Sequence, residues 1–290
     1  MISLSSTTEL VGALQHARDV TLTAYTLPQG AVLDALASAA KRGAHVRVRL
    51  EGYIYKDDGT VDAANADAIE RLRGAGADAQ LVHAAVDAPD PMLHLKGAVV
   101  DQSVFLDDRN WPDDGGDTIV RDDFALDAGM VRDAASGVED RSTPFFSVRK
   151  RESLSSEARL INEAQKGDDV IIESESFGGA NHVYTALDDA AKRGAHVRVL
   201  VAARELQGNA NEQTAIDRLV HDGAAVRVCE ADEKFAVVRE SRGWLGSANA
   251  TAAFDHPDQL DWGLRTDDAN ILTHLHAAFE SRWTTATVSS

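Results

Sequence analysis

An internal repeat constrains the fold of this chain more than any other feature. Residues 39–48 read AAKRGAHVRV, and residues 190–199 repeat the same ten letters. The similarity extends upstream, where the segment from Leu4 resembles that from Leu154, and downstream, where the segment from Ala68 resembles that from Ala215. The 290 residues therefore predict two copies of one unit of about 145 residues. We expect the first copy over residues 1–140, a linker over 141–155 and the second copy over 156–290.

Each copy alternates between stretches that favour strands and stretches that favour helices. Short β-favouring runs lie at residues 20–25 and 170–174, and a stretch with one apolar face follows each. Both of these stretches end in Lys-Arg-Gly, with glycine at the helix stop (Gly43 and Gly194), and the strand HVRV comes next. This order predicts an α/β fold of two homologous halves, each a mixed, largely parallel sheet flanked by helices. Apolar residues recur at helical spacing in both copies: Leu33, Leu36, Ala37, Ala40, and Val183, Ala186, Leu187, Ala190.

Composition and charge limit the function classes. The only cysteine, Cys229, excludes an intramolecular disulfide framework and a cysteine-based zinc site. No apolar run approaches the ~20 residues of a membrane-spanning helix, and no secretory signal is visible, so we expect a cytoplasmic protein. Acidic residues outnumber basic ones by 47 to 29, which gives a net charge of −18, and both halves are acidic. Nucleic acid and anionic membranes are therefore disfavoured as partners.

Two local runs of charge have simple interpretations. The basic run Arg149-Lys150-Arg151 in the expected linker is interpreted as solvated charge, with a docking site for an acidic partner as the alternative. Residues 107–127 hold eight aspartates and two arginines, and are expected to form a solvated acidic loop. This segment does not match the regular ligand spacing of a calcium loop, so we predict no metal site.

The segment MLHLKGAVVD carries residues suited to phosphate chemistry. His94 and Lys96 are two apart on a β-favouring stretch, which predicts that both side chains lie on one face. An imidazole can attack phosphorus while an adjacent ammonium holds a non-bridging oxygen. Asn110, a little further on, is a neutral donor suited to a second oxygen.

These residues resemble the signature of the phospholipase D superfamily. His94, Lys96 and Asp101 match its H-x-K-x4-D pattern, and Gly246, Ser247 and Asn249 match its G-S-x-N segment. The tandem repeat and the order of elements are also similar to that family over nearly the whole chain. The resemblance implies a pseudo-twofold molecule in which each half contributes one motif to a single site.

The resemblance also implies a mechanism and roles for residues. One histidine attacks phosphorus to form a phosphohistidine, and the other protonates the leaving group and then activates water. Lysines, asparagines and serines bind the phosphoryl oxygens, and an acid after each asparagine orients a histidine. No metal or organic cofactor is required.

Both copies depart from this pattern. The second copy has Asp232 where histidine is expected, keeps Lys234, and has Arg239 at the aspartate position. In the first copy Asp107 and Asp108 replace the glycine and the serine of G-S-x-N, and this segment lies one residue closer to its motif. The second histidine is missing, although much of a phosphate-binding site is retained.

The remaining acid–base roles have named candidates. Asp117, which aligns with Asp261, is predicted to orient the His94 ring, and the alternative is that it is one acid in a crowded loop. Asp101 is expected to cap a turn rather than to take part in chemistry. Asp232 is the candidate general acid if it stays protonated, and the alternative is a residue that has drifted in a dead half-site. His256 is a further, weaker candidate.

We therefore predict a metal-independent phosphodiesterase, or a phosphatidyl-type hydrolase or transferase, that acts through His94. Its substrate would be a phosphodiester or a small phospholipid-type molecule. The alternative is a catalytically inactive protein of the same fold that binds phosphate or serves as a scaffold, while a nuclease is disfavoured by charge. The sequence does not specify the head group or the oligomeric state. The predicted phosphate ligands are Lys96, Asn110, Lys234, Ser247 and Asn249.

Overall fold

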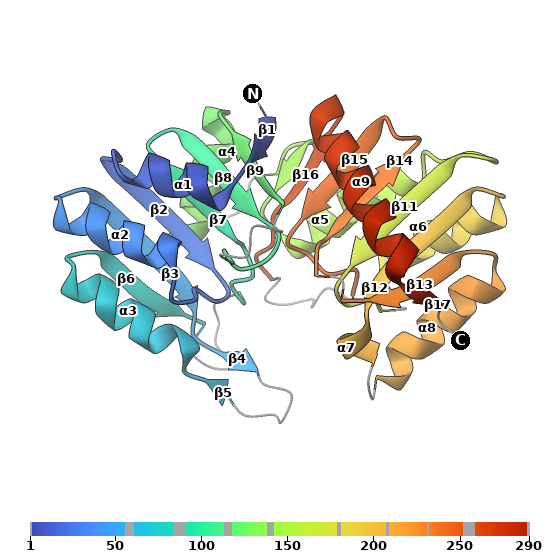
Figure 1. Ribbon diagram of the computed structural model, residues 1–290, viewed down its shortest axis with the longest axis horizontal. Helices are drawn as coiled ribbons and strands as arrows, with labels where there is room; N and C mark the ends of the chain where they lie inside the picture. The colour runs from blue at the N-terminus through green and yellow to red at the C-terminus, as the bar shows by residue number, and fades with distance from the viewer. Residues whose placement is uncertain are drawn as a thin grey trace. The chain divides into compact units, whose positions relative to one another are not determined.

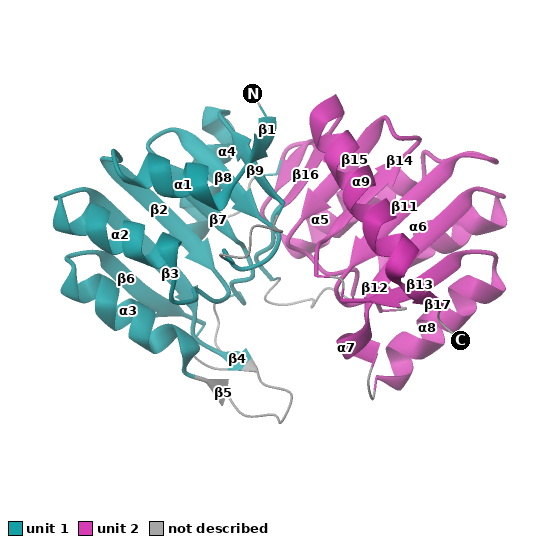
Figure 2. Ribbon diagram, in the orientation of Figure 1, with its two compact units in different colours: residues 1–142, 254–262 teal, residues 143–253, 263–290 magenta. Residues whose placement is uncertain are grey.

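The computed structural model describes residues 2–55, 61–83, 91–112, 118–137, 142–178, 181–206, 209–230, 232–251 and 259–288. The chain forms two compact units (Figure 2). Unit 1 comprises residues 1–142 and 254–262, and unit 2 comprises residues 143–253 and 263–290.

Unit 1 is built on a seven-stranded sheet in the order β1-β9-β8-β7-β2-β3-β6, with a separate two-stranded ribbon, β4-β5 (Figure 1). Its helices cover both faces of the sheet. The strands are β1 (Ile2–Ser5), β2 (Asp19–Ala24), β3 (His45–Glu51), β4 (Ile54–Tyr55), β5 (Val61–Asp62), β6 (Asp78–Val82), β7 (Gly97–Val100), β8 (Ser103–Asp107) and β9 (Ile119–Asp122). The helices are α1 (Thr7–Leu14), α2 (Ala31–Lys41), α3 (Ala64–Gly74) and α4 (Ala125–Ala135).

Unit 2 repeats this plan with an eight-stranded sheet in the order β10-β16-β15-β14-β11-β12-β13-β17. The strands are β10 (Phe146–Ser147), β11 (Asp169–Ser174), β12 (His196–Ala202), β13 (Ala225–Cys229), β14 (Phe235–Val238), β15 (Arg242–Gly246), β16 (Gly263–Thr266) and β17 (Thr287–Val288). The helices are α5 (Lys150–Ile161), α6 (His182–Lys192), α7 (Ala203–Leu206), α8 (Ala210–His221) and α9 (Ala269–Thr285).

The repeated sequence AAKRGAHVRV occupies the same place in both units. It covers the end of α2 and most of β3 in unit 1, and the end of α6 and most of β12 in unit 2. Gly43 and Gly194, with φ of +92° and +87°, follow these helices in the left-handed region, as the sequence predicts. All eight apolar positions predicted for the two helices are buried.

The mixed α/β architecture is confirmed, but the sheets are less parallel than expected. Among the described strands, only the pairs β2–β3 and β3–β6 are parallel in unit 1, and only β11–β12 and β12–β13 in unit 2. The remaining pairs are antiparallel, because β7, β8 and β9 form a meander that needs no helical crossover. The β7–β8 hairpin turns over two residues, whereas the equivalent β14–β15 hairpin turns over three, which explains the one-residue difference in motif spacing.

The connection between the units also differs from the expectation. Residues 150–155, placed in the linker by the sequence, form the first half of α5. Lys150 is not solvated: its side chain is buried and Nζ donates to Thr251 Oγ1 at 2.9 Å. Residues 259–262, placed in the second copy, pack within unit 1. This return of the chain brings Asp261 to the first motif.

Side chains along each central strand point alternately to the two faces of the sheet, and the apolar face forms the core. In unit 1 the apolar side chains of β2 and β3 pack with those of α1, α2 and α3 in one buried cluster, and unit 2 has an equivalent cluster beneath α5, α6 and α8. The opposite faces carry α4 and α9 (Figure 1). Among the described residues, no helix is both long enough and apolar enough to cross a bilayer.

The prediction of a solvated acidic loop over residues 107–127 is wrong for the part that the structure describes, because four of its carboxylates are buried. Asp107, Asp108, Asp122 and Asp127 are all buried, while residues 113–117 lie outside the described part of the chain. Asp107 and Asp122 accept backbone amide hydrogen bonds at the ends of β8 and β9. Asp107 and Asp122 therefore serve local structure, because burial of a carboxylate is costly unless it accepts hydrogen bonds.

Candidate active site

The first motif lies on an extended segment that leads into β7. Leu93 forms an isolated parallel bridge with Leu260, in which His94 N donates to Leu260 O and Leu260 N donates to Met92 O, both at 2.9 Å. The regular strand begins only at Gly97, after Lys96. The bridge thus fixes the backbone on which the motif residues stand.

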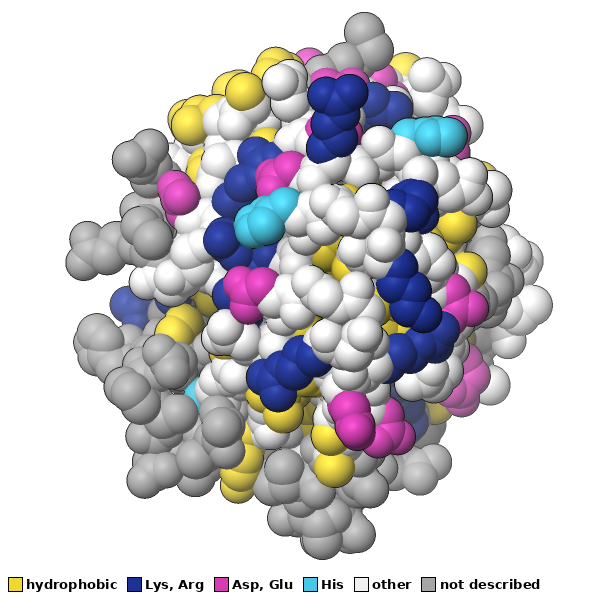
Figure 3. All heavy atoms as spheres, turned by 90° about the vertical axis from the view of Figure 1, so that its left-hand side faces the viewer, with side chains coloured by type: hydrophobic (Ala, Val, Ile, Leu, Met, Phe, Trp, Pro, Cys, Tyr) yellow, Lys and Arg dark blue, Asp and Glu magenta, His cyan; other side chains and the backbone are white. Residues whose placement is uncertain are grey.

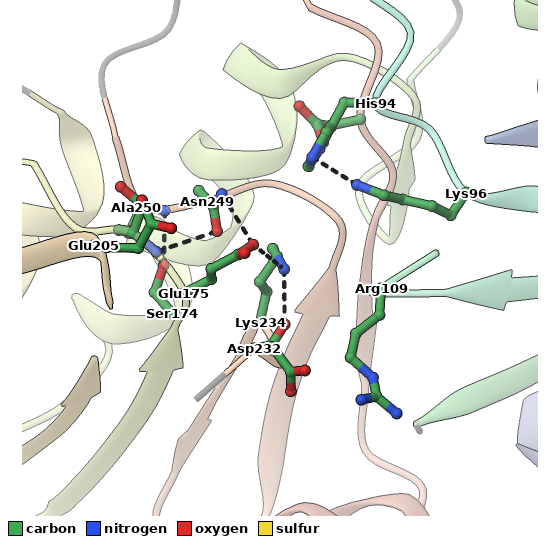
Figure 4. Close-up of polar contacts among 12 residues, drawn as sticks. His94, Lys96, Arg109, Ser174, Glu175, Glu205, Asp232, Lys234, Asn249 and Ala250 are labelled. Carbon is green, nitrogen blue, oxygen red and sulfur yellow. Dashed lines mark hydrogen bonds and ion pairs between the residues drawn. The ribbon is translucent and has the colours of Figure 1, made fainter. Parts of the chain in front are cut away.

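Asp261, His94 and Lys96 form a continuous polar chain. Nδ1 of His94 lies 2.7 Å from Asp261 Oδ1. Nε2 of the same ring lies 2.7 Å from Lys96 Nζ, a contact drawn in Figure 4. An ammonium can only donate, so Nε2 accepts from Lys96, and Nδ1 carries the proton that Asp261 accepts. The imidazole is thereby held neutral with its lone pair on Nε2, the state that a nucleophile requires.

The polar chain is largely withdrawn from water. The Asp261 side chain is fully buried, that of His94 is 13% exposed, and Lys96 is 1% exposed. Tyr25 packs its ring edge-on against the imidazole with centroids 5.3 Å apart. Trp262, next to Asp261, donates from Nε1 to Asp107 O at 2.7 Å, which anchors the returning segment. Desolvation strengthens each of these electrostatic contacts.

A second histidine–carboxylate pair supports the motif backbone. Glu51, fully buried at the end of β3, accepts from Leu93 N at 2.7 Å and from Tyr53 N at 2.8 Å. His83 Nδ1 lies 2.6 Å from Glu51 Oε1. Burial raises the pKa of Glu51, although these hydrogen bonds and His83 oppose the rise. Sequence reasoning missed Glu51, because a lone acid at a strand end carries no signal until Leu93 is seen beside it.

Asn110 lies in a turn that Asp107, which stands in place of the family's glycine, holds in shape. Asp107 accepts from Arg109 N at 2.7 Å and also from Trp111 N, so this carboxylate organises the turn after β8. Asn110 Oδ1 accepts from Thr26 N at 3.2 Å, so its Nδ2 donors point away from that contact. The substitution of glycine by Asp107 therefore preserves the position of the asparagine.

In the second half the motif lysine is engaged by acidic neighbours. Lys234 is 2% exposed, and its Nζ lies 3.0 Å from Glu175 Oε2 and 2.8 Å from the backbone oxygen of Asp232 (Figure 4). Arg204 Nη2 contacts Glu175 at 2.5 Å. Burial alone would raise the pKa of Glu175, but the charges of Lys234 and Arg204 outweigh burial, so its pKa is lowered. The ion pair therefore stabilises the folded state above the ordinary glutamate pKa, and loses this effect as the pH falls below it.

The intact G-S-x-N segment follows β15. Ser247 is fully buried, and Asn249 Oδ1 accepts from Ser176 N at 3.4 Å, as Asn110 does from Thr26. Asn249 Nδ2 lies 3.5 Å from Glu175 Oε2. Because Thr26 and Ser176 correspond, Glu175 occupies the position of Tyr25. A charged acid thus replaces the aromatic ring that lies against His94 in unit 1.

The aspartate position of the H-x-K-x4-D motif lies at a hairpin turn in both units. Asp101, with φ of +53°, accepts from Arg18 N and Asp19 N at 3.0 Å from its exposed turn. Arg239, with φ of +55°, occupies the equivalent turn, and its Nε donates to Asp168 Oδ2 at 2.6 Å. Both side chains join the hairpin to the start of the central strand.

The orienting carboxylate found in the structure is Asp261. Asp117, predicted for this role, and His256 both lie outside the described residues, so their roles stay predictions. The alignment of Asp261 with Asp117 was the available signal, but it did not reveal that the returning segment packs within unit 1. Within the described ranges, no group of three or more His, Cys, Asp and Glu side chains is arranged to hold a metal.

Comparisons with known proteins agree with this fold. A family model described as "Cardiolipin synthase, PLD-like domain" matches residues 10–107 and 158–283. A polyphosphate kinase from Porphyromonas gingivalis superposes with a TM-score of 0.68 at 14% identity, covering 96% of this chain but 46% of the kinase, so the chain spans less than half of that protein. A phosphatidylserine synthase from Haemophilus influenzae superposes with a TM-score of 0.64 at 12% identity, covering 99% of this chain and 87% of the synthase. No curated protein matches the sequence.

The Asp261–His94 contact gives a prediction that needs no catalytic activity. Asp261→Asn is expected to shift His94 toward the tautomer protonated at Nε2, because an amide can donate to Nδ1. It should also lower the free energy of unfolding by about 1–3 kcal/mol, as expected for a disturbed buried polar contact. Nitrogen-15 NMR of histidine side chains, assigned with His94→Gln, measures the tautomer. Asp101→Asn is the control, and an unchanged His94 signal in Asp261→Asn would contradict the assignment.

Proposed function

The chain belongs to the family of phospholipase D-like domains, and on that basis we propose that it is a metal-independent phosphodiesterase that acts through His94. The observation that carries the proposal is the chain Asp261–His94–Lys96, with contacts of 2.7 Å on both ring nitrogens. This arrangement supports nucleophilic attack, because it supplies a neutral imidazole, a carboxylate for the imidazolium that develops, and an ammonium for the phosphate.

The proposed reaction has two steps. When a phosphodiester binds, the Lys96 ammonium moves its hydrogen bond from Nε2 to a non-bridging oxygen, which frees the Nε2 lone pair. Nε2 attacks phosphorus, the bond to the leaving oxygen breaks, and a general acid gives that oxygen a proton. Water then attacks the phosphohistidine, the P–N bond breaks, and the proton of water returns to the general base. Asp261 stabilises the positive ring throughout.

The ligands of the phosphoryl group come from both motifs in this proposal. Asn110 supports binding in the first half, because its Nδ2 donors point away from the Thr26 contact. Lys234, Ser247 and Asn249 are assigned by resemblance, and their roles remain predictions. The acidic composition favours a small phosphodiester over nucleic acid, and we propose the cytoplasm as the compartment.

Hydrolysis of bis-p-nitrophenyl phosphate in the presence of a chelator tests the proposal. The wild type should turn over, because p-nitrophenolate needs little protonation when it leaves, and His94→Ala should lose about 10³-fold or more of the rate, since the nucleophile is gone. An acid-quenched reaction should also show one added phosphoryl group on the wild-type chain by mass spectrometry. Equal rates near background in both proteins would remove the enzymatic function.

We further propose Asp232 as the general acid, which predicts dependence on the leaving group. Asp232→Asn should lower the rate by about 10²-fold for an alkyl leaving group and hardly at all for p-nitrophenol, because general acid catalysis matters most for poor leaving groups. The pH–rate profile for the alkyl ester checks this. An alkaline limb that is the same in the variant and the wild type would assign the acid elsewhere.

A second candidate function, a protein of this fold that does not turn over, is favoured by the Lys234–Glu175 ion pair at 3.0 Å, because this pair engages one of the predicted phosphate ligands. A lysine whose charge is already compensated contributes little to an incoming phosphate. Glu175→Gln should therefore tighten inorganic phosphate binding by about fivefold to tenfold, as measured by calorimetry at pH 7. Glu70→Gln, which removes the same charge from the exposed surface of α3 in unit 1, is the control. Equal phosphate affinity in Glu175→Gln and wild type would show that the ion pair does not limit binding.

A further inference from the structure

We infer that unit 1 contains a second binding site, on the α4 face of its sheet, for an anion with a flat aromatic body. A cavity of about 410 Å³ lies there, within the range typical of ligand sites. Arg47, Arg49 and Gln80 form its polar wall, and the end of α4 closes one side. The apolar wall includes Val82, Leu93 and Leu260.

The same position in unit 2 is filled by aromatic side chains. Arg47 corresponds to Arg198, and Gln80 to Arg227, by the equivalent registers of β3–β6 and β12–β13. The guanidinium carbon of Arg198 lies 5.2 Å from the ring centre of Phe279, and that of Arg227 lies 4.6 Å from the ring centre of Trp283. These two rings stack with centroids 5.4 Å apart. Unit 2 therefore covers this face with an aromatic pair on two arginines.

Unit 1 keeps the first of these two arginines as Arg47, and its described residues place no aromatic pair over it. Helices α4 and α9 each begin three residues after the equivalent strands β9 and β16, so Ala135 stands where unit 2 has Phe279. Helix α4 has 11 residues and α9 has 17, and Gly137, with φ of +70°, follows the end of α4. The small side chain and the shorter helix together leave the cavity. A flat aromatic group would restore the contacts that Phe279 makes in unit 2.

The charges of the wall favour an anionic ligand. Arg47 and Arg49 share one carboxylate, Asp78, with nitrogen–oxygen distances of 3.5 and 2.9 Å. Asp78 is 41% exposed, so it screens the two guanidiniums only in part. Although the whole chain is acidic, several Lys and Arg side chains lie on the face of the molecule drawn in Figure 3. Because two guanidiniums share one carboxylate, one positive charge stays uncompensated. A carboxylate on the aromatic body of the ligand would pair with it.

This site is separate from the nucleophile and adjoins its support. Leu93 and Leu260, which line the cavity, are the two bridge residues that directly precede His94 and Asp261. Binding in the cavity does not depend on catalysis, because the ligand would contact Leu93 and Leu260 rather than His94 and Asp261. A ligand in the cavity would be reported by the side chains of these two leucines.

Titration of the wild-type protein with 2-naphthoate, followed by NMR of its leucine methyl groups, tests the inference. Leu93 and Leu260 signals should shift and saturate. The saturated analogue decalin-2-carboxylate should bind about threefold to fivefold more weakly, since it cannot stack on Arg47, and neutral 2-naphthylmethanol about tenfold more weakly. Equal binding of the two carboxylates would overturn the aromatic specificity, and equal binding of naphthoate and the alcohol would overturn the anionic one.

Two variants localise the binding. Ala135→Phe places the side chain of Phe279 in the cavity and should weaken naphthoate binding at least about tenfold, whereas Ala66→Phe, on the exposed face of α3, should not change it. Arg47→Met removes one charge from a half-exposed side chain and gives the same test if Ala135→Phe does not fold. Wild-type affinity in a folded Ala135→Phe, or no shift of Leu93 and Leu260, would overturn the site.

Discussion

The hydrogen bond between Asp261 and His94 is the contact on which the geometry of the first motif depends. A carboxylate with no exposed surface is costly to bury, and it is tolerated here because the protonated Nδ1 of the ring lies 2.7 Å away. The contact selects one tautomer and leaves Nε2 to Lys96. This contact requires the chain to return to unit 1 at residues 254–262, after residues 143–253 have formed most of unit 2 along the sequence. The β-bridge between Leu93 and Leu260 and the hydrogen bond from Trp262 stabilise the returning segment.

The two halves differ more in their charges than in their backbones. Asn110 and Asn249 make the same contact with a loop amide, and the turns of Asp101 and Arg239 lie at the same place. The decisive difference is Glu175 in place of Tyr25. In unit 1 the neighbour is the ring of Tyr25, and the ammonium of Lys96 contacts the imidazole of His94. In unit 2 the carboxylate of Glu175 forms an ion pair with the ammonium of Lys234. The asymmetry therefore concerns which groups are available to bind a phosphate.

Much of the fold could be predicted because the repeat and the periodicity act locally. The helices that end at Gly43 and Gly194 follow from apolar spacing and a glycine stop, and their buried faces are as expected. The motif residues His94 and Lys96 were also found from their spacing. What the sequence could not reveal depends on contacts between distant residues. Glu51 acts on Leu93 from 42 positions away, and Asp261 acts on His94 from 167 positions away.

The substituted motif positions show why loss of a motif need not mean loss of structure. Arg239 replaces an acid that accepts backbone amides, yet it secures the same hairpin by pairing with Asp168. Asp107 replaces a glycine, yet it builds the turn that presents Asn110. Each substituted side chain makes a new local contact, so the fold is kept although the motif residue has changed. Selection on stability alone would therefore accept either a working or a silent second half. The two halves therefore differ in the side chains around Lys96 and Lys234 rather than in the fold.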